Sequence, residues 1–481
     1  MSRGFARPLA RIGFAILVFV TLAAAIMSRE DKWMMDFDQP FYLSIAYDLD
    51  RHHVFSNGIL DTVDSTVQAP PPGMFFSPLY PLMIAAAMKV DDRFAESVRC
   101  FIETDDDRGD PNTCKVDARP MHVLHALFLT LAVLSIGWAA GTILSWPGAF
   151  YAAGTIATVG IVAEAELFSF VMTESVWLGL YSLLMLVFVL ALKSCRIRDF
   201  AAAGGILGIL CLTRPSYLAI VPILLGVIPA YAWCCRGRQA RTVRNVAAVA
   251  LAFAIVVTPW LVRNAVSVGK LRFTEEYGSA ALIERFAYND MTAREFALAF
   301  PYCVPVVGPA AVKSLFGKYS MARFQWNHEG SFFYAGRAHR VELWATHGSL
   351  DRIIGGLVRD EMRQNWWRHL VTSIPLAWCG IWVSGLFSLI LAPLFAWACF
   401  VAARERNMLF FAYALPALLL IGLHGVIGNH YSRYNLGLIG PFALGAALVM
   451  LRATASRRSD EMPAPARVRA TAAERRASRV S

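Results

Sequence analysis

Two carboxylates stand close together in the stretch DFDQPFYLSIAYDL, residues 36–49, just beyond the first apolar segment of the chain. Asp36 and Asp38 occupy the point where a membrane helix would emerge into water, and Pro40, Tyr42 and an apolar-periodic run follow them. A carboxylate in a cavity can act as a general base, while a second one orients it or binds a polar substrate. The alternative for Asp38 is an ordinary helix cap or a solvated loop acid.

A second acid, Glu174, stands at the predicted start of another apolar helix, in the sequence TESVWLGL. An acid in the first turn of a helix interacts favourably with the helix dipole, so a purely structural role is the alternative for this residue. If the two helix ends converge on one cavity, Asp38 could serve as the base and Glu174 as the orienting acid.

Three arginines, Arg214, Arg263 and Arg433, stand at predicted external helix ends, where the positive-inside rule disfavours them. A planar guanidinium binds phosphate oxygens bidentately, so these side chains are candidate phosphate ligands. Ion pairing with the acids described above is the alternative. His430, in NHYSRY, is a candidate phosphate ligand or base, although a lone interfacial histidine often has neither role.

Apolar stretches of membrane-spanning length must position these groups. The chain has 481 residues, of which 57% are hydrophobic and 17% charged. Several of its apolar stretches reach the roughly 20 residues that a helix needs to cross a bilayer. We therefore expect an all-α polytopic membrane protein with about ten transmembrane helices. The first apolar stretch, residues 13–27, has no small-residue cleavage site after it and is expected to remain as a helix.

The formal charge of +10 comes from basic residues in short loops and tails, so it indicates topology rather than nucleic-acid binding. Placing these loops in the cytoplasm puts both termini inside and leaves two long external regions, residues 28–119 and 263–370, with interfacial helices in each. The transmembrane domain is expected to comprise residues 1–452, followed by a disordered basic cytoplasmic tail at 453–481. Nearly all out-of-place polar residues then fall on the external side.

The nine cysteines divide into two groups. Cys100 and Cys114 bracket a polar, acidic loop, where a disulfide would contribute about 3 kcal/mol of stability. Such a bond requires an oxidising compartment, which agrees with an external location. The other seven lie in or beside apolar stretches and are interpreted as small buried hydrophobes: Cys195, Cys211, Cys234, Cys235, Cys303, Cys379 and Cys399.

Taken together, these motifs resemble the GT-C glycosyltransferases, polytopic enzymes that include protein O-mannosyltransferases and the aminoarabinose transferases of lipid A. The first external loop of that family carries an acid, followed four residues later by an aromatic and then a small-residue helix. Here this pattern corresponds to DQPFYLSIA, with Asp38 and Tyr42 in the matching places. The further matches are SPLYPL, which contains Tyr80, then TRPSYL, TPWLVRNAVSVGKL, and SRYNLGLIGPFAL, which contains Tyr434.

The resemblance implies an inverting glycosyltransferase in a membrane, expected to be the bacterial inner membrane, with its active site facing the periplasm or exterior. A polyprenyl-phosphate-linked sugar would be the donor, and a hydroxyl of a glycan, glycolipid or protein the acceptor. Asp38 takes the place of the catalytic base, and Glu174 corresponds to a second acid. The residues expected to bind substrate are Asp36, Tyr42, Tyr80, Arg214, Arg263, His430, Arg433 and Tyr434.

Two positions depart from the family pattern. Gln39 follows the acid where relatives often have glutamate, and Ser77 replaces the basic residue before the prolines. No Cys or His cluster has zinc spacing, so no cofactor is assigned, and participation of a divalent metal stays open. A transporter or lipid flippase and a non-catalytic envelope assembly protein are the alternatives. A transporter would carry its charges near the bilayer midplane, whereas here they favour one face.

Overall fold

The structure is a computed structural model that describes residues 2–29, 34–61, 63–104, 114–235, 239–325, 328–428 and 431–461. All regular secondary structure within these ranges is helical, which confirms the expected all-α class. Eight helical segments in the described ranges are long and apolar enough to cross a membrane, and they indicate a multi-pass membrane protein. They are Pro8–Met27, Arg119–Leu144, Glu174–Ser194, Pro215–Cys235, Arg241–Ser267, Leu386–Arg404, Met408–Ile427 and Ser432–Ala455.

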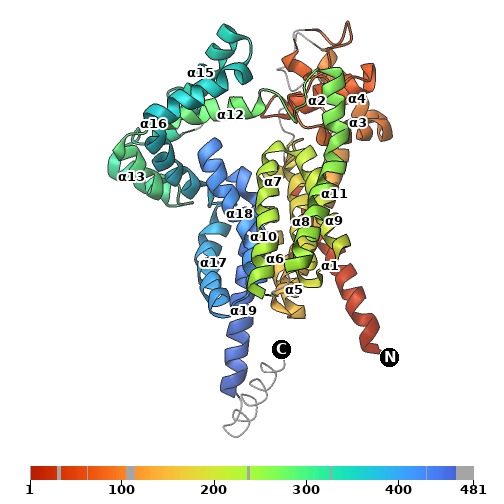
Figure 1. Ribbon diagram of the computed structural model, residues 1–481, viewed down its shortest axis with the longest axis vertical. Coiled ribbons are helices and arrows are strands. Elements are labelled where there is room, and N and C mark those ends of the chain that lie inside the picture. The colour runs from red at the N-terminus through yellow and green to blue at the C-terminus, as the bar shows by residue number, and fades with distance from the viewer. Residues whose placement is uncertain are drawn as a thin grey trace.

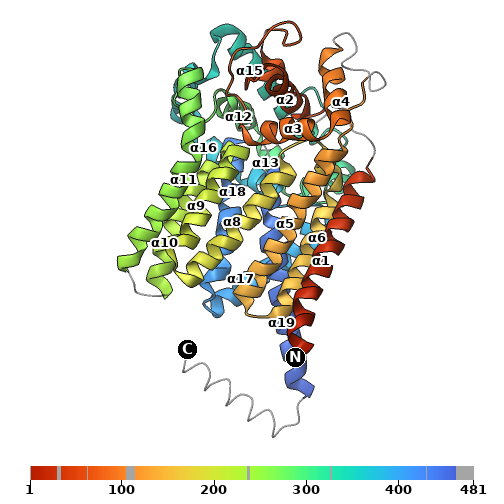
Figure 2. The same ribbon diagram turned by 90° about the vertical axis from the view of Figure 1, so that its right-hand side faces the viewer.

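The long helices lie side by side in one bundle (Figures 1 and 2). Two helices of 17 residues lie in it beside the longer ones, so the expected number of about ten spans depends on whether these two also cross. The bundle helices are α1 (Ser2–Met27), α5 (Arg119–Leu144), α6 (Pro147–Ala163), α8 (Glu174–Ser194), α9 (Ile197–Thr213), α10 (Ile220–Cys235), α11 (Gln239–Ser267), α17 (Leu386–Arg404), α18 (Met408–Ile427) and α19 (Ile439–Glu461).

Small residues and tight turns allow this packing. A Cβ atom on Gly204 of α9 would lie 2.2 Å from the carbonyl oxygen of Val249, so only glycine permits the observed approach of α9 to α11. Ser145 and Cys195 adopt left-handed backbone conformations at the ends of α5 and α8, which stops each helix and turns the chain back. Short connections of this kind place consecutive spans antiparallel to one another.

Two further sets of helices cover one end of the bundle, and we call them the first cap and the second cap (Figure 1). The first cap, within residues 34–104, contains α2 (Gln39–His52), η1 (Gly58–Leu60), α3 (Leu79–Val90) and α4 (Asp92–Glu103). The second cap, within residues 270–380, contains α12 (Tyr277–Phe286), η3 (Ala287–Asp290), α13 (Ala293–Tyr302), α14 (Gly308–Phe316), η4 (Ala322–Phe324), α15 (Phe332–His347) and α16 (Leu350–Gly380).

The two caps correspond to the two long regions that the positive-inside rule placed outside the membrane. Helix α1 begins and helix α19 ends at the opposite end of the bundle from the caps (Figures 1 and 2). Helix α19 continues to Glu461, past residue 452, where a disordered tail was expected to begin. Residues 462–481 of that expected tail lie outside the described residues.

A buried arginine joins the second cap to the bundle. Arg285 of α12 has no exposed surface, and its Nε donates to the carbonyl oxygen of Gly425 in α18 at 2.7 Å. Its Nη2 donates to the hydroxyls of Thr372 and Ser373 in α16, at 3.0 and 2.9 Å. Burial lowers the pKa of Arg285 to about 10, which still leaves the guanidinium charged at neutral pH. These bonds hold the last turn of α12 against the bundle and α16.

Two disulfides lie at the cap end. Cys100 is bonded to Cys114, the pair that bracketed the polar loop. Cys303, just after α13, is bonded to Cys379 in the last turn of α16. The interpretation of Cys303 and Cys379 as separate buried hydrophobes was therefore wrong. It failed because 76 residues of sequence separate them, and only the packing of α13 against α16 brings their Cα atoms to 5.1 Å.

Candidate active site

Asp38 directly precedes helix α2, but its side chain does not cap this helix. It occupies the N-cap position, yet its side chain makes no capping hydrogen bond. Pro40 lies in the first turn, and its missing N–H leaves less for a cap to satisfy. Phe37, just before it, has φ of +56°, a strained conformation for a bulky residue. The carboxylate of Asp38, which is partly buried, therefore remains available to other partners.

Glu174 and Arg214 form a buried ion pair beside this position. Glu174 is the first residue of α8, and Arg214 follows the end of α9. The Oε1 atom of Glu174 accepts a hydrogen bond from Nη1 of Arg214 at 3.3 Å. The guanidinium of Arg214 also lies 4.9 Å from the ring centre of Tyr434, within cation–π range. For Arg214, the structure therefore shows the ion pair that was the alternative to a role as phosphate ligand.

Arg433 stands at the start of η5 (Ser432–Leu438) and is held by neutral groups. Its guanidinium lies 5.3 Å from the ring centre of Phe37 and 5.0 Å from that of Tyr434, whose hydroxyl it also contacts at 3.2 Å. Its Nη1 is 4.0 Å from the sulfur of Met172. Across the described ranges, no acid forms an ion pair with Arg433. Its charge is therefore free to act on an anion that enters the site.

The charges of these residues act on Asp38 together. Burial raises the pKa of the Asp38 carboxyl, Arg433 pulls it back, Glu174 raises it and Arg214 lowers it. Two acids and two arginines therefore share one electrostatic environment, although they come from segments far apart in the sequence. The sequence allowed Asp38 and Glu174 to converge, whereas it presented the two arginines as a separate set.

Tyr277, the first residue of α12, brings the second cap into the site, and sequence reasoning missed it. Burial raises the pKa of Tyr277; Asp38 raises it further, and Arg214 lowers it. Its ring packs against Phe75 and Phe76 of the first cap, with centres 5.8 and 6.0 Å apart. Its neighbour Glu276 has φ of +64°, so a strained residue precedes Tyr277 just as Phe37 precedes Asp38.

Tyr42 and Tyr80 pack on one another behind Asp38. Their ring centres are 5.1 Å apart, and burial raises the pKa of Tyr42, with Asp38 adding to the rise. The hydroxyl of Tyr80 lies 2.9 Å from Nε2 of His125, whose Nδ1 is 2.9 Å from the carbonyl oxygen of Phe168. A carbonyl can only accept, so Nδ1 donates to it and Nε2 of the neutral ring accepts from Tyr80. Tyr80 therefore supports Tyr42 and is committed to a buried hydrogen bond of its own.

The residues expected to bind substrate also include Arg263, Asp36 and His430. Arg263 donates to the carbonyl oxygens of Phe55 and Gly73, so it joins α11 to the first cap instead of facing Asp38. The main-chain carbonyl of Asp36 accepts a hydrogen bond from Gln39. His430 lies outside the described residues.

Gln39, the departure from the family pattern, has a structural task. It is fully buried, and its Oε1 accepts from the main-chain N–H of Val171 at 2.8 Å. Its Nε2 donates to the carbonyl oxygen of Asp36 at 3.2 Å. A glutamate could make the first bond but, when ionised, not the second. The amide thus ties the segment that carries Asp38 to the segment that leads into α8 and Glu174.

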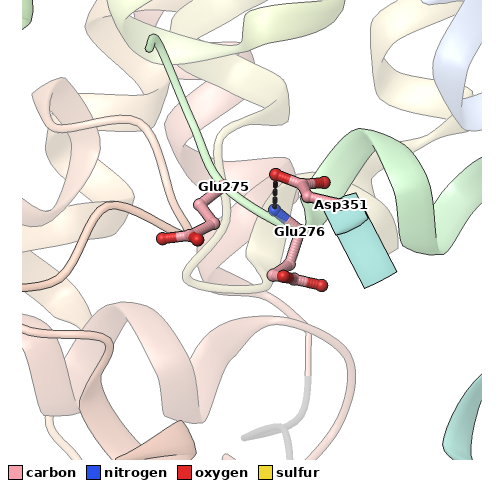
Figure 3. Close-up of side chains that lie close together, drawn as sticks. All are labelled: Glu275, Glu276 and Asp351. Atoms are coloured by element: carbon pink, nitrogen blue, oxygen red, sulfur yellow. Dashed lines mark hydrogen bonds between the residues drawn. The ribbon is translucent and has the colours of Figure 1, made fainter. Parts of the chain in front are cut away.

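Within the described ranges, one group of acids has spacing suitable for a metal ion, namely Glu275, Glu276 and Asp351, drawn in Figure 3. Asp351 accepts from the main-chain N–H of Glu276 at 3.2 Å and from the Ser279 hydroxyl at 2.6 Å. Glu276 accepts from the Ser349 hydroxyl and from the N–H of Leu350, at 2.5 and 2.6 Å.

These bonds make the acids a joint between two helices. Glu276 accepts a hydrogen bond from the first N–H group of α16, and Asp351 accepts one from the N–H group just before α12. The acid beside α12 therefore caps α16, and the acid in α16 caps α12. Lys270 and Arg272 pair with Glu275 and Asp351, which balances much of the negative charge. The donor set therefore fits a helix joint better than a cation site, and its position fixes the start of α12 and with it Tyr277.

No protein-family model matches the chain, and no curated protein matches it either. The chemistry of the site must therefore be inferred from its geometry and from the sequence motifs.

Proposed function

We propose that this chain is an inverting glycosyltransferase that moves a sugar from a polyprenyl-phosphate-linked donor to an acceptor hydroxyl at the cap end of the membrane. The observation that carries the proposal is the state of Asp38. It is an acid without a capping bond, partly buried and influenced by two arginines, while the neighbouring acid Glu174 is already paired with Arg214. The motif resemblance centred on Asp38 and Tyr42 supports the same assignment.

The proposed reaction uses the two unequal acids differently. Asp38 takes the proton from the acceptor hydroxyl as that oxygen attacks the anomeric carbon of the donor. The bond between that carbon and the phosphate oxygen breaks on the opposite side, and its electron pair leaves with the polyprenyl phosphate. Arg433 stabilises the charge that develops on the phosphate. Glu174 holds Arg214 in place on the face of Tyr434, so that a second cation lies near the leaving group.

Two features support placing the cap end in an oxidising compartment, such as the periplasm of a bacterial inner-membrane protein. Both disulfides lie at this end. Basic residues gather at the opposite end, as the positive-inside rule requires of a cytoplasmic face, in the turns after α8 and α17. A lipid-linked donor would then reach Arg433 from the outer leaflet, and the acceptor would approach from the watery side.

The test is a transfer assay with the full-length protein reconstituted in lipid. A panel of polyprenyl-phosphate sugars is supplied with mixed glycan and glycolipid acceptors, and acceptor-dependent release of polyprenyl phosphate is measured. We expect release with at least one donor, and its loss in the Asp38→Asn variant at normal expression and thermal stability. A fully active Asp38→Asn protein would rule out this residue as the base.

The alternatives predict different results in the same preparation. A transporter or flippase would move lipid between leaflets with no bond broken, so fluorescent lipid would change sides without release of polyprenyl phosphate. A non-catalytic assembly protein would tolerate Asp38→Asn when envelope glycans are scored in cells. The charged residues of the site stand at helix ends and not in the middle of the spans, which favours the enzyme.

A further inference from the structure

An open groove of about 600 Å³ lies at the edge between the second cap and the bundle. Its walls come from the end of α13, from η4, from the break between α16 and α17, and from the start of η5. This volume is in the range of pockets that hold small ligands. The groove is separate from the residues that surround Asp38, none of which lines it.

The lining of the groove is aromatic and uncharged. No acidic or basic side chain is among the described residues that line it. Flat rings alternate with neutral groups that can form hydrogen bonds, and these are contributed by Tyr302, Phe324, Gln325, Trp382, Tyr431 and Ser432. A phosphate or a charged peptide would find no counter-charge among these described residues, and an aliphatic chain would offer no hydrogen-bond partner to the indole nitrogen of Trp382. Rings with hydroxyl groups, as in an uncharged sugar, suit both features.

Trp382, which lines the groove, has a buried hydrogen-bond donor. The indole nitrogen of Trp382 is buried without a hydrogen-bond partner in the described part of the chain. The indole of Trp378, whose ring centre is 5.0 Å away, donates to the carbonyl oxygen of Phe300 at 2.9 Å. An unpaired buried donor is unfavourable, so a ligand hydroxyl that reaches Trp382 after a small ring movement would recover that free energy.

The groove is connected to the charged site through the chain, and a disulfide helps to hold its shape. Tyr431 and Ser432 line it and directly precede Arg433 in the chain. The disulfide between Cys303 and Cys379 forms part of the wall and holds α13 against α16, which reduces the free energy needed to order the groove on binding. Pro305 also lines it, and the next residues, Val306 and Val307, are exposed apolar side chains that suit a membrane edge.

We infer that this groove binds an uncharged saccharide of the acceptor, and that Trp382 is its principal contact. The inference rests on the proposed function, because it assigns a neutral sugar to the acceptor whose hydroxyl Asp38 would activate. The acceptor could be a free oligosaccharide or one anchored to a lipid, since the same sugar rings would be recognised in both.

Binding can be measured without any donor. The full-length protein in nanodiscs, prepared without glycoside detergents, is titrated by calorimetry with neutral glucose and mannose oligosaccharides of three to six units. A uronic-acid oligosaccharide and a short-chain polyprenol serve as comparison ligands. We expect a neutral oligosaccharide to bind, and Trp382→Ala to weaken it about tenfold, the order expected from one aromatic contact.

Matched variants separate binding from folding. Trp397→Ala removes an exposed tryptophan of α17 outside the groove and should leave saccharide affinity unchanged. Gln325→Leu alters an exposed groove residue with little risk to the fold, and should weaken binding by a few fold. Binding that is equal in Trp382→Ala, Gln325→Leu and wild type would overturn the inference. So would the absence of neutral saccharide binding, or tighter binding of the uronic-acid oligosaccharide or the polyprenol.

The two proposals can fail separately. If the wild type releases polyprenyl phosphate and Trp382→Ala has the same KM for the acceptor, the groove assignment is wrong and the transferase stands. If no donor is used but neutral saccharide binds and Trp382→Ala loses it, the transferase assignment is wrong and the groove stands. If Trp382→Ala weakens the binding of a lipid-anchored saccharide but not of a free one, the groove binds the acceptor in its lipid-anchored form.

Discussion

Two acidic clusters lie at the start of helices in the caps, and they differ in what surrounds their oxygens. In the joint of α12 and α16, the carboxylates of Glu276 and Asp351 accept hydrogen bonds from helix ends and hydroxyls. At the start of α2, the Asp38 carboxylate makes no capping bond and is influenced by arginines instead. The joint has more acids close together, which would favour it as a functional site. The carboxylate oxygens of Asp38, however, are not used for helix capping, which favours Asp38 instead.

A carboxylate that can act as a base is therefore better identified by oxygens that do not cap a helix than by the number of acids around it. An acid that satisfies helix N–H groups contributes to stability and has little basicity left to offer. An acid that is desolvated and left without such donors has a raised pKa and can take a proton. The expected effect of a substitution on transfer should accordingly be largest at Asp38 and smallest at the joint.

The largest effect is expected from Asp38→Asn. Loss of a general base should lower kcat by about 10²- to 10⁴-fold. The same variant should unfold at the same or a higher temperature, because burial of the ionised carboxylate is unfavourable and asparagine removes that charge. Steady-state kinetics and a thermal melt in one preparation measure both. A variant that loses stability together with activity would indicate a structural role for Asp38.

Arg433→Gln should come next. Removal of one preorganised charge from the leaving group is expected to lower kcat by about 10²- to 10³-fold. The matched control is Arg272→Gln, because Arg272 is an exposed arginine that pairs with Asp351 in the joint. An exposed pair contributes little, so this control should change transfer less than about twofold. If Arg433→Gln and Arg272→Gln lowered kcat equally, the proposed functional difference between the Asp38 cluster and the helix joint would be wrong.

The pH dependence should follow the raised pKa of Asp38. The base must be ionised, so kcat/KM should fall about tenfold per unit as the pH drops below that pKa. Because the pKa is raised by burial, the fall should begin at a higher pH than the roughly 3.9 of a free aspartate. The folded state binds this proton more tightly than the unfolded state, so this group makes the protein less stable as pH rises through the same window. An acid limb that persists unchanged in Asp38→Asn would belong to another residue.

The smallest effect on transfer is expected at the joint. Glu276→Gln keeps one acceptor oxygen for Ser349 or Leu350 and loses the other, which should lower the free energy of unfolding by about 1 kcal/mol. Transfer should change by only a few fold, through the position of Tyr277. Chemical denaturation and KM measurements test this. Loss of transfer on the scale of Asp38→Asn, restored by added divalent metal, would instead make the joint a cation site.

Much of this architecture could be predicted from the sequence. Apolar length predicted the spans, and basic turns predicted which ends of the helices lie together. The resemblance to the glycosyltransferase pattern, in which an acid precedes an aromatic by four residues, implied Asp38 instead of Asp36 as the base, and the structure leaves Asp38 without a capping bond. The positive-inside rule also predicted that the charged residues of the site share one end of the bundle: Asp38, Glu174, Arg214 and Arg433.

What could not be predicted depends on packing between distant segments. Tyr277 reaches the site because Arg285 and the helix joint fix α12, and no motif marks it. Arg263 resembles the other two external arginines in sequence, but backbone carbonyls of the first cap take its donors. Cys303 and Cys379 looked like apolar residues because hydropathy does not show which helices meet.

The order of synthesis gives the site one further property. Its residues come from the start of α2, the starts of α8 and α12, the end of α9, and η5, which leads into the last helix. Helices α2 to α18 lie between Asp38 and Arg433 in the chain, so a ribosome must complete all of them before the two residues can meet. A truncated or partly inserted chain would hold the carboxylate without its cation. If the proposed transfer takes place at this site, we expect it to require full assembly of the bundle, and fragments of this protein to be inert.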